Sequence, residues 1–188
     1  MSRKSYHRVL VVAIDPVDID VMGAACDAVE RHFEAVCFIE EPLVPPESAY
    51  DASRRQYRSD VILGYLNLLA PDKFEKVIGI TELDLYTPGL NFVFGQAILN
   101  GRQAVVSVAR LRPEFYGQPP NPTLMVERIR KEVTHELGHL YGLEHCDNRE
   151  CVMSFSNSIL EVDMKGENFC PRCQRFLKHK LAAGDDGR

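Results

Sequence analysis

The chain has 188 residues, of which 45% are hydrophobic and 26% are charged, and its formal net charge is −5. This length suits one domain with an ordinary buried core, and the composition is that of a globular protein. The excess of acidic residues gives no sign of the basic surface that a typical nucleic-acid-binding domain has, so we expect no nucleic-acid partner. No apolar run is long enough to span a membrane, so we expect no membrane partner either.

The N-terminal part alternates strand and helix patterns. A continuous apolar run at 7–14 predicts a strand that is covered on both faces. Asp15 can cap the next helix, with Pro16 in its first turn, and apolar residues at helical spacing continue to Phe33. A short second strand is predicted at 35–40.

The middle of the chain continues this alternation. A second helix is predicted at 59–70 and a third strand at 74–81. Strands that alternate with helices favour a mainly parallel sheet with right-handed crossovers. Asn100 and Gly101 lie between two apolar runs, which is typical of a hairpin, so at least one antiparallel strand joins the sheet. The sequence therefore predicts a mixed α/β fold.

The N-terminus and the cysteines both bear on the cellular compartment. The apolar stretch at 9–14 is shorter than that of a signal peptide, and no small-residue cleavage site follows it, so we expect a cytoplasmic chain. Four of the six cysteines lie in the last 43 residues, and in a chain without an export signal this clustering favours metal binding over disulfides. The other two, Cys26 and Cys37, are predicted to be buried small hydrophobic residues on the first helix and the second strand.

The clearest helix is predicted at about 123–141 and contains the motif H-E-x-x-H. His135 and His139 are one helical turn apart, so both imidazoles project from the same face. Glu136 lies beside them. In this motif the two imidazoles bind zinc and the glutamate is a general base.

Residues around and beyond the motif extend this interpretation. Gly142 can adopt the left-handed conformation that ends a helix, and His145 then returns as a third nitrogen ligand, which leaves the fourth position for water. The apolar stripe of the helix lies about 200° away from the histidines, which are therefore predicted to face a cleft. Three basic residues of the helix are expected to form a solvated face: Arg128, Arg130 and Lys131.

A second set of metal ligands follows directly. Its spacing, C-x4-C and then C-x2-C, is close to that of a closed structural zinc site: Cys146, Cys151, Cys170 and Cys173. Four thiolates fill the coordination sphere, whereas three neutral imidazoles leave the zinc its positive charge and an open position. We therefore expect two zinc ions per chain, a catalytic one on the histidines and a structural one on the cysteines.

These motifs resemble those of the metzincin metallopeptidases and, within that clan, of the archaemetzincin (archaelysin) family. The stretch HELGHLYGLEH, from His135 to His145, is similar to the metzincin helix, glycine turn and third ligand. The cysteine that follows at once, the C-x4-C spacing, the CVM stretch and the later C-x2-C are similar to the archaemetzincin additions. The resemblance covers 135–173 and implies that Met153 is the methionine of the Met-turn beneath the zinc.

The resemblance also implies a metzincin-like architecture in a single catalytic domain. Residues 1–142 would form an upper lobe with a twisted sheet and the active-site helix. Residues 143–188 would form a small irregular lobe with the Met-turn and the four-cysteine site. An antiparallel edge strand, which we place within 91–97, would receive an extended peptide. Residues 154–157 are expected to line a pocket for a substrate side chain.

The predicted function is zinc-dependent hydrolysis of peptide bonds by metal-activated water, with Glu136 as the general base and then the general acid. Two alternatives stay open at this point. Bacterial zinc-dependent endoribonucleases that act on single strands also space three histidines as H-x3-H-x5-H. A non-catalytic, zinc-stabilised binding domain would keep the same ligands. The glutamate, Met153 and the four cysteines favour the peptidase.

Overall fold

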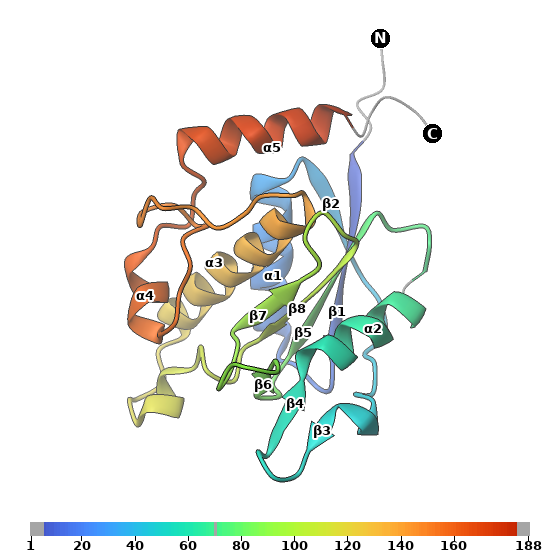
Figure 1. Cartoon of the computed structure of the whole chain (residues 1–188), viewed down its shortest axis with the longest axis vertical. Helices are drawn as coiled ribbons and strands as arrows, with labels where there is room; N and C mark the ends of the chain where they lie inside the picture. The colour runs from blue at the N-terminus through green and yellow to red at the C-terminus, as the bar shows by residue number, and fades with distance from the viewer. Residues whose placement is uncertain (1–5, 70, 184–188) are drawn as a thin grey trace.

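The computed structural model describes residues 6–69 and 71–183, and its centre is a five-stranded sheet (Figure 1). The strands, in spatial order, are β2 (Ala35–Ile39), β1 (His7–Ile14), β5 (Lys76–Thr81), β8 (Gln103–Ser107) and β7 (Gly95–Ala97). Neighbouring strands are parallel except for β7, which pairs antiparallel with β8 at the edge of the sheet. The predicted mixed α/β fold is confirmed, and the antiparallel edge strand lies within the predicted segment 91–97.

Helices cover both faces of this sheet, as the uninterrupted apolar sequence of β1 requires. Helices α1 (Ile19–His32) and α3 (Pro122–Leu140) pack on one face, and α2 (Ser59–Leu69) packs on the other (Figure 1). Alternate residues of β1 enter the two cores: Val9, Val11 and Ala13 on the side of α1 and α3, and Leu10, Val12 and Ile14 on the side of α2. Because successive side chains of a strand point to opposite faces of the sheet, β1 contributes to a hydrophobic core on each face.

The hairpin at Asn100 and Gly101 joins β7 to β8, as predicted, and ties the sheet edge to the end of α3. Asn100 has a φ of 54°, a conformation that asparagine tolerates better than most residues. Its backbone N–H donates a hydrogen bond of 2.8 Å to the carbonyl of His139. The Nζ of Lys76 donates to the carbonyls of Gly101 and Leu140, at 2.6 and 2.9 Å. These bonds hold β7 across the last turn of α3.

Several short elements have no counterpart in the predictions. A second, three-stranded sheet consists of β3 (Tyr50–Asp51), β4 (Gln56–Arg58) and β6 (Leu85–Tyr86). The 3-10 turns η1 (Glu47–Ala49) and η2 (Pro113–Tyr116) are also new, as is helix α4 (Ile159–Met164). Elements this short contain too few residues for a hydrophobic periodicity to be recognised in the sequence. The last described element is the C-terminal helix α5 (Pro171–Ala183). Within the described ranges, no helix combines the length and apolarity needed to cross a membrane.

Helix α1 begins later than predicted, so the assignment of Asp15 as its cap is wrong. Asp15 has a φ of 71° and lies before the helix, and its N–H donates a hydrogen bond of 2.9 Å to the carbonyl of Leu43. Ile14 also forms an isolated parallel bridge with Leu43. The pairing with Leu43 thus continues beyond the last residue of β1. The residue that directly precedes helix α1 is Asp18, and the first helical residue is Ile19.

The prediction of a solvated basic face on α3 is also wrong. Arg128 is 3% exposed and donates hydrogen bonds of 2.7 Å to both carboxylate oxygens of Asp163. Lys131 is 6% exposed and donates to the backbone carbonyls of Val162 and Asp163, at 3.2 and 3.1 Å. Helix α4 supplies all these acceptors, so the two cations hold the C-terminal segment on α3.

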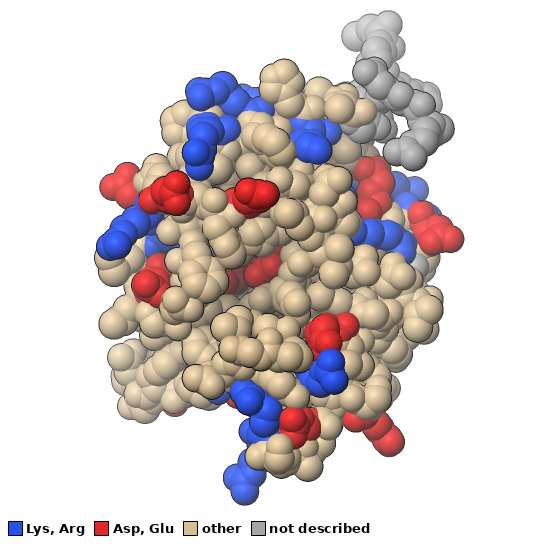
Figure 2. All heavy atoms as spheres, viewed as in Figure 1, with Lys and Arg blue, Asp and Glu red and all other residues tan. Residues whose placement is uncertain are grey.

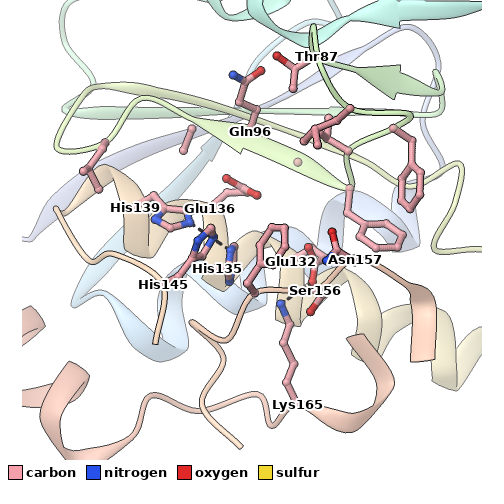
Figure 3. A pocket seen from close by; sticks show the side chains of 18 of the residues that line it. Thr87, Gln96, Glu132, His135, Glu136, His139, His145, Ser156, Asn157 and Lys165 are labelled. Atoms are coloured by element: carbon pink, nitrogen blue, oxygen red, sulfur yellow. Dashed lines mark hydrogen bonds and ion pairs between the residues drawn. The ribbon is translucent and has the colours of Figure 1, made fainter. Parts of the chain in front are cut away.

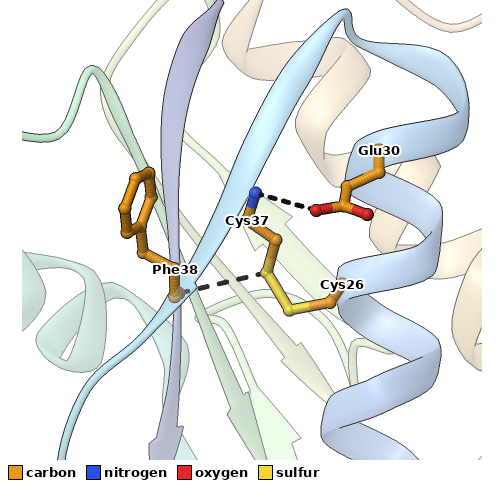
Figure 4. Close-up of a disulfide and its surroundings, with 4 residues drawn as sticks. All are labelled: Cys26, Glu30, Cys37 and Phe38. Atoms are coloured by element: carbon orange, nitrogen blue, oxygen red, sulfur yellow. Dashed lines mark hydrogen bonds between the residues drawn. A yellow bond between two sulfur atoms is a disulfide. The ribbon is translucent and has the colours of Figure 1, made fainter.

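Cys26 and Cys37 form a disulfide between α1 and β2, which corrects the prediction that they are unpaired (Figure 4). Their Cα atoms are 5.4 Å apart, within the range that a disulfide requires. The N–H of Cys37 also donates a hydrogen bond of 3.4 Å to the carboxylate of Glu30 on α1. Spacing alone carried no signal for this pair, because the contact depends on how the helix lies against the following strand. The other four cysteines are free.

Removing this disulfide should lower the stability of the protein moderately. The double change Cys26→Ala and Cys37→Ala should reduce the free energy of unfolding by about 2–3 kcal/mol without reductant, because the cross-link restricts the unfolded chain. Urea unfolding followed by circular dichroism measures this difference. With a phosphine reductant, both proteins should unfold at the same urea concentration. Equal stability without reductant would contradict the cross-link.

Candidate active site and metal centres

Three histidines converge at the C-terminal half of α3. His135 and His139 lie one turn apart, and their Nε2 atoms are 3.1 Å from each other. Gly142 has a φ of 89° and turns the chain sharply after the helix. The ring of His145 then lies against both, with its centroid 5.3 Å from that of His135 and 4.8 Å from that of His139. One nitrogen from each histidine lies within 4.8 Å of the others, so the fold brings all three predicted ligands together.

Backbone carbonyls determine which nitrogen of each helical histidine faces the centre. The Nδ1 of His135 donates to the carbonyl of Val152 at 2.8 Å, and the Nδ1 of His139 donates to the carbonyl of Leu143 at 2.7 Å. A proton on each Nδ1 leaves a free lone pair on each Nε2. An acceptor behind the ring that sets the tautomer in this way is typical of histidines that bind metals.

The histidine cluster fits a zinc ion in distance and in charge. Tetrahedral zinc with bonds of about 2.0–2.1 Å separates two ligand nitrogens by about 3.3 Å. The distance between the Nε2 atoms of His135 and His139, 3.1 Å, is close to this value. Burial lowers the pKa of all three histidines, that of His139 to about 4. The imidazoles are therefore neutral at physiological pH, which is the state that binds a metal.

Glu136 lies beside this cluster at the floor of a cleft and is 5% exposed. Burial raises the pKa of its carboxyl well above the ordinary range, and the nearby carboxylate of Glu132 adds to this effect. A carboxylate with a raised pKa is a better proton acceptor. The backbone of Gly95 in β7 approaches from the opposite side, and a Cβ at this position would lie 2.6 Å from the Oε1 of Glu136. A glycine is therefore needed to leave room for the carboxylate.

The four C-terminal cysteines form a second cluster, with one sulfur from each residue within 4.8 Å of the others. The Sγ atoms of Cys146 and Cys170 are 3.8 Å apart. Four sulfurs at about 2.3 Å from a tetrahedral zinc are separated by about 3.8 Å, so this cluster fits a closed zinc site. The N–H of Cys170 donates to the Sγ of Cys151 at 3.2 Å, and Arg172 donates to the Sγ of Cys146 at 3.4 Å. Both donors would complement the negative charge of thiolates bound to a metal.

The turn that contains Met153 connects the two clusters. The N–H of Cys146 donates a hydrogen bond of 2.9 Å to the carbonyl of Met153, and the preceding carbonyl, of Val152, accepts the bond from His135. Met153 is fully buried, and its sulfur packs so closely against Gly138 that a Cβ there would overlap it. The cysteine cluster, the turn and the histidine cluster thus form a continuous set of contacts.

A cleft of about 810 Å³ passes over the histidine cluster. Its lining comes from the segment around β7, from α3, and from the chain after α3. Figure 2 shows the hollow across this face of the molecule, with acidic atoms visible at its bottom. In Figure 3, Glu136 and the three histidines lie between the strand above and the C-terminal chain below. Among the described residues, β7 ends the sheet and pairs with β8 alone, so no further strand lies along its outer edge.

Three cleft residues that lie close enough to affect Glu136 were given no individual role from the sequence. They are Gly95, Glu132 and Lys165, the last of which follows α4 directly. Lys165 and Glu132 form a buried ion pair of 2.8 Å. A glycine inside a strand pattern signals the close approach of another group, so Gly95 had a detectable signal. The ion pair had none, because its members lie far apart in the sequence.

A mixed α/β fold with an H-E-x-x-H helix and a third histidine in its cleft defines a zinc-dependent metallopeptidase of the metzincin type. A sequence profile of Peptidase family M54 matches residues 43–179. The archaemetzincin of Methanocaldococcus jannaschii is 43% identical over 175 residues, which are 92% of this chain and 95% of that protein. The chain belongs to peptidase family M54, the archaemetzincins.

Solved structures agree with this assignment. The crystal structure of the archaemetzincin of Methanopyrus kandleri matches with a TM-score of 0.85 and 42% identity, over 96% of this chain and 98% of that one. A zinc-dependent peptidase from Methanocorpusculum labreanum matches with a TM-score of 0.77 and 28% identity, over 90% of this chain and 99% of that one. The predicted function, a zinc-dependent peptidase, is confirmed.

Proposed function

We propose that His135, His139 and His145 hold a catalytic zinc ion and that Glu136 moves the protons of peptide hydrolysis. The observation that supports this most directly is the convergence of three neutral imidazoles beside a buried carboxylate at the floor of the cleft. When bound there, zinc supplies a Lewis acid that acidifies water and polarises a carbonyl group.

Glu136 carries the proton between the two stages of the reaction. Its carboxylate accepts a proton from the attacking water, and the resulting carboxylic acid donates this proton to the nitrogen of the leaving amine. The side chain is thus ionised again at the end of each cycle. Burial, which raises the pKa of Glu136, favours the first transfer, and the space beside Gly95 allows the carboxylate to lie at the cleft floor.

The substrate is an extended segment of a peptide or protein. The outer edge of β7 offers backbone N–H and C=O groups to such a segment, in the manner of an added strand. Three apolar side chains of the cleft are about half exposed and suit apolar parts of the substrate: Leu90 (47%), Leu99 (50%) and Phe155 (49%). The net charge of −5 gives no reason to expect a nucleic acid.

The four cysteines hold a second, structural zinc, which makes two ions per chain. This ion has no open position, so its role is to fix the lower lobe (143–188) against the upper lobe (1–142) of a single catalytic domain. Met153, between the clusters, supports the floor of the histidine site as a Met-turn residue. We place the enzyme in the cytoplasm, where these thiols stay reduced and the Cys26–Cys37 pair would be largely a dithiol.

An unbiased peptide mixture tests this function. The zinc-loaded, reduced protein should produce fragments that mass spectrometry identifies, whereas the protein stripped by a chelator should produce none until zinc is returned. Single-stranded RNA incubated with the same samples should stay intact. The fragment ends would show whether the enzyme trims termini or cuts internally. Fragments of equal yield in the stripped sample would refute a zinc-dependent reaction.

The change Gly95→Ala should displace the Glu136 carboxylate and reduce kcat by roughly 10²-fold, since a shift of about 1 Å in a reacting group has effects of this size. The added Cβ would lie 2.6 Å from the Oε1 of Glu136. Gly64→Ala in α2 is the matched control, because a Cβ there meets no atom within 4 Å. Steady-state kinetics on a fluorogenic peptide would separate the two variants. Equal kcat values would show that the contact has no consequence.

A further inference from the structure

Three side-chain polar atoms at one end of the cleft are buried and have no hydrogen-bond partner among the described residues. They are the Nζ of Lys165, the Oε1 of Glu132 and the Oγ of Ser156, and all three residues line the same cavity as Glu136. Lys165 and Glu132 are each 3% exposed. Figure 3 shows Lys165 extending from the C-terminal chain toward Glu132, with Ser156 and Asn157 at the same end of the pocket. We name Lys165, Glu132 and Ser156 the polar end of the cleft.

The ion pair does not satisfy these groups. The Nζ of Lys165 lies 2.8 Å from the Oε1 of Glu132 as an ion pair, yet neither atom forms a hydrogen bond with any residue that the structure describes. A lysine ammonium has three N–H donors and a carboxylate oxygen has two lone pairs, so most of their capacity is unused. Buried polar groups in folded proteins are nearly always paired, and exceptions point to a functional role or a bound molecule.

In the same contact between α3 and the C-terminal segment, the other two buried cations, Arg128 and Lys131, do have hydrogen-bond acceptors. Arg128 donates three hydrogen bonds, to Asp163 and to the carbonyl of Leu111. Lys131 donates to two backbone carbonyls at the end of α4. Neither residue lines the cleft, whereas Lys165 does. Among these three buried cations, the one without a hydrogen bond to a described residue is therefore the one that lines the cleft.

We propose that the polar end of the cleft is a specificity pocket for a substrate side chain that carries a carboxamide, as in glutamine or asparagine. This inference rests on the proposed peptidase function and specifies its substrate. A carboxamide oxygen accepts hydrogen bonds from Lys165 and Ser156, and its NH₂ group donates to Glu132. One neutral group thus meets two donors and one acceptor at the same time.

The other side-chain classes match this end of the cleft less well. A carboxylate would place its charge beside Glu132 and Glu136, both of which are buried. An ammonium or guanidinium group would meet the ammonium of Lys165. An aliphatic side chain would displace water and leave all three polar atoms unpaired, which is the most effective basis for rejecting an analogue. Of the four classes compared, the carboxamide is the one that avoids both like charges and unpaired groups.

Binding to a variant that cannot turn over tests this pocket independently of catalysis. The zinc-loaded Glu136→Gln protein would be titrated into fluorescent hexapeptides of alanine that carry one Gln, Met, Glu or Lys at each position in turn. Met and Glu match Gln in length, so they isolate the carboxamide. Fluorescence anisotropy should show that Gln binds about 10-fold more tightly than Met at one position, as expected for hydrogen bonds to a charged group. Glu and Lys should bind no better than Met.

Two further variants assign the preference to these residues. Ser156→Ala keeps the ion pair and should reduce the ratio of Gln to Met affinity several-fold. The double change Lys165→Met and Glu132→Gln removes both charges together and should abolish the ratio. Circular dichroism verifies that each variant is folded. Equal or undetectable binding of Gln and Met peptides at every position would overturn the proposal, as would a preference for Glu or a ratio that survives in both variants.

These outcomes are distinguishable from failure of the proposed function itself. Wild-type protein that cleaves no peptide would count against Glu136 as the proton carrier, whereas the affinities above would still decide the pocket. Cleavage of peptides without any carboxamide preference would agree with Glu136 as the proton carrier and would overturn the specificity pocket.

Discussion

Replacing Glu136 by glutamine should lower kcat for peptide hydrolysis by about 10³-fold, within the range of general acid–base catalysis. Glutamine keeps the shape of the side chain but accepts no proton at neutral pH. KM should change little, and both zinc ions should stay bound, because the histidines and cysteines are untouched. Steady-state kinetics with a fluorogenic peptide, together with metal analysis of the purified variant, would measure both effects.

Glu144→Gln is the matched control for this change. Glu144 lines the same cleft but is exposed to solvent, so its replacement removes one negative charge without altering the buried site. Its kcat should stay within about twofold of the wild type, as surface changes usually have small effects. If Glu136→Gln retained wild-type turnover, another group would have to accept the proton, and Glu136 would lose its assigned role.

The change Cys151→Ser should release the structural zinc and lower the free energy of unfolding by about 4 kcal/mol or more, as loss of a metal site often does. Cys151 is 1% exposed, and its N–H donates to the carbonyl of Asn148 within the loop that the zinc would close. Metal analysis should find one zinc per chain in place of two. Urea unfolding should show the loss of stability.

Activity should fall in the same variant, even though no histidine is changed. The cysteine loop holds the turn whose Val152 carbonyl accepts the hydrogen bond from His135, so a loosened turn no longer orients that ring. Cys26→Ser under reducing conditions is the matched control, because it alters a cysteine outside the cluster and should retain two zinc ions. A Cys151→Ser protein with two zinc ions and unchanged stability would refute the structural site.

The local features of this protein could be predicted from residues that lie close together in the chain. The spacing of His135 and His139 places both on one helical face, because that relation depends only on the helical repeat. The apolar run of β1 predicted a strand buried on both faces, and the Asn100–Gly101 pair predicted the hairpin that adds the edge strand. In each case the informative residues lie within a few positions of one another, so backbone geometry alone connects them.

Only the tertiary structure decided the features that join distant segments. The Cys26–Cys37 bond depends on how α1 lies on β2, and the Asp15 turn depends on pairing with Leu43. The sequence predicted that Arg128 is solvated, whereas in the fold it donates hydrogen bonds to Asp163 of α4. The ion pair of Glu132 and Lys165 likewise needs the C-terminal chain to fold back over α3. Such contacts form because packing brings together groups whose separation along the chain carries no periodic signal.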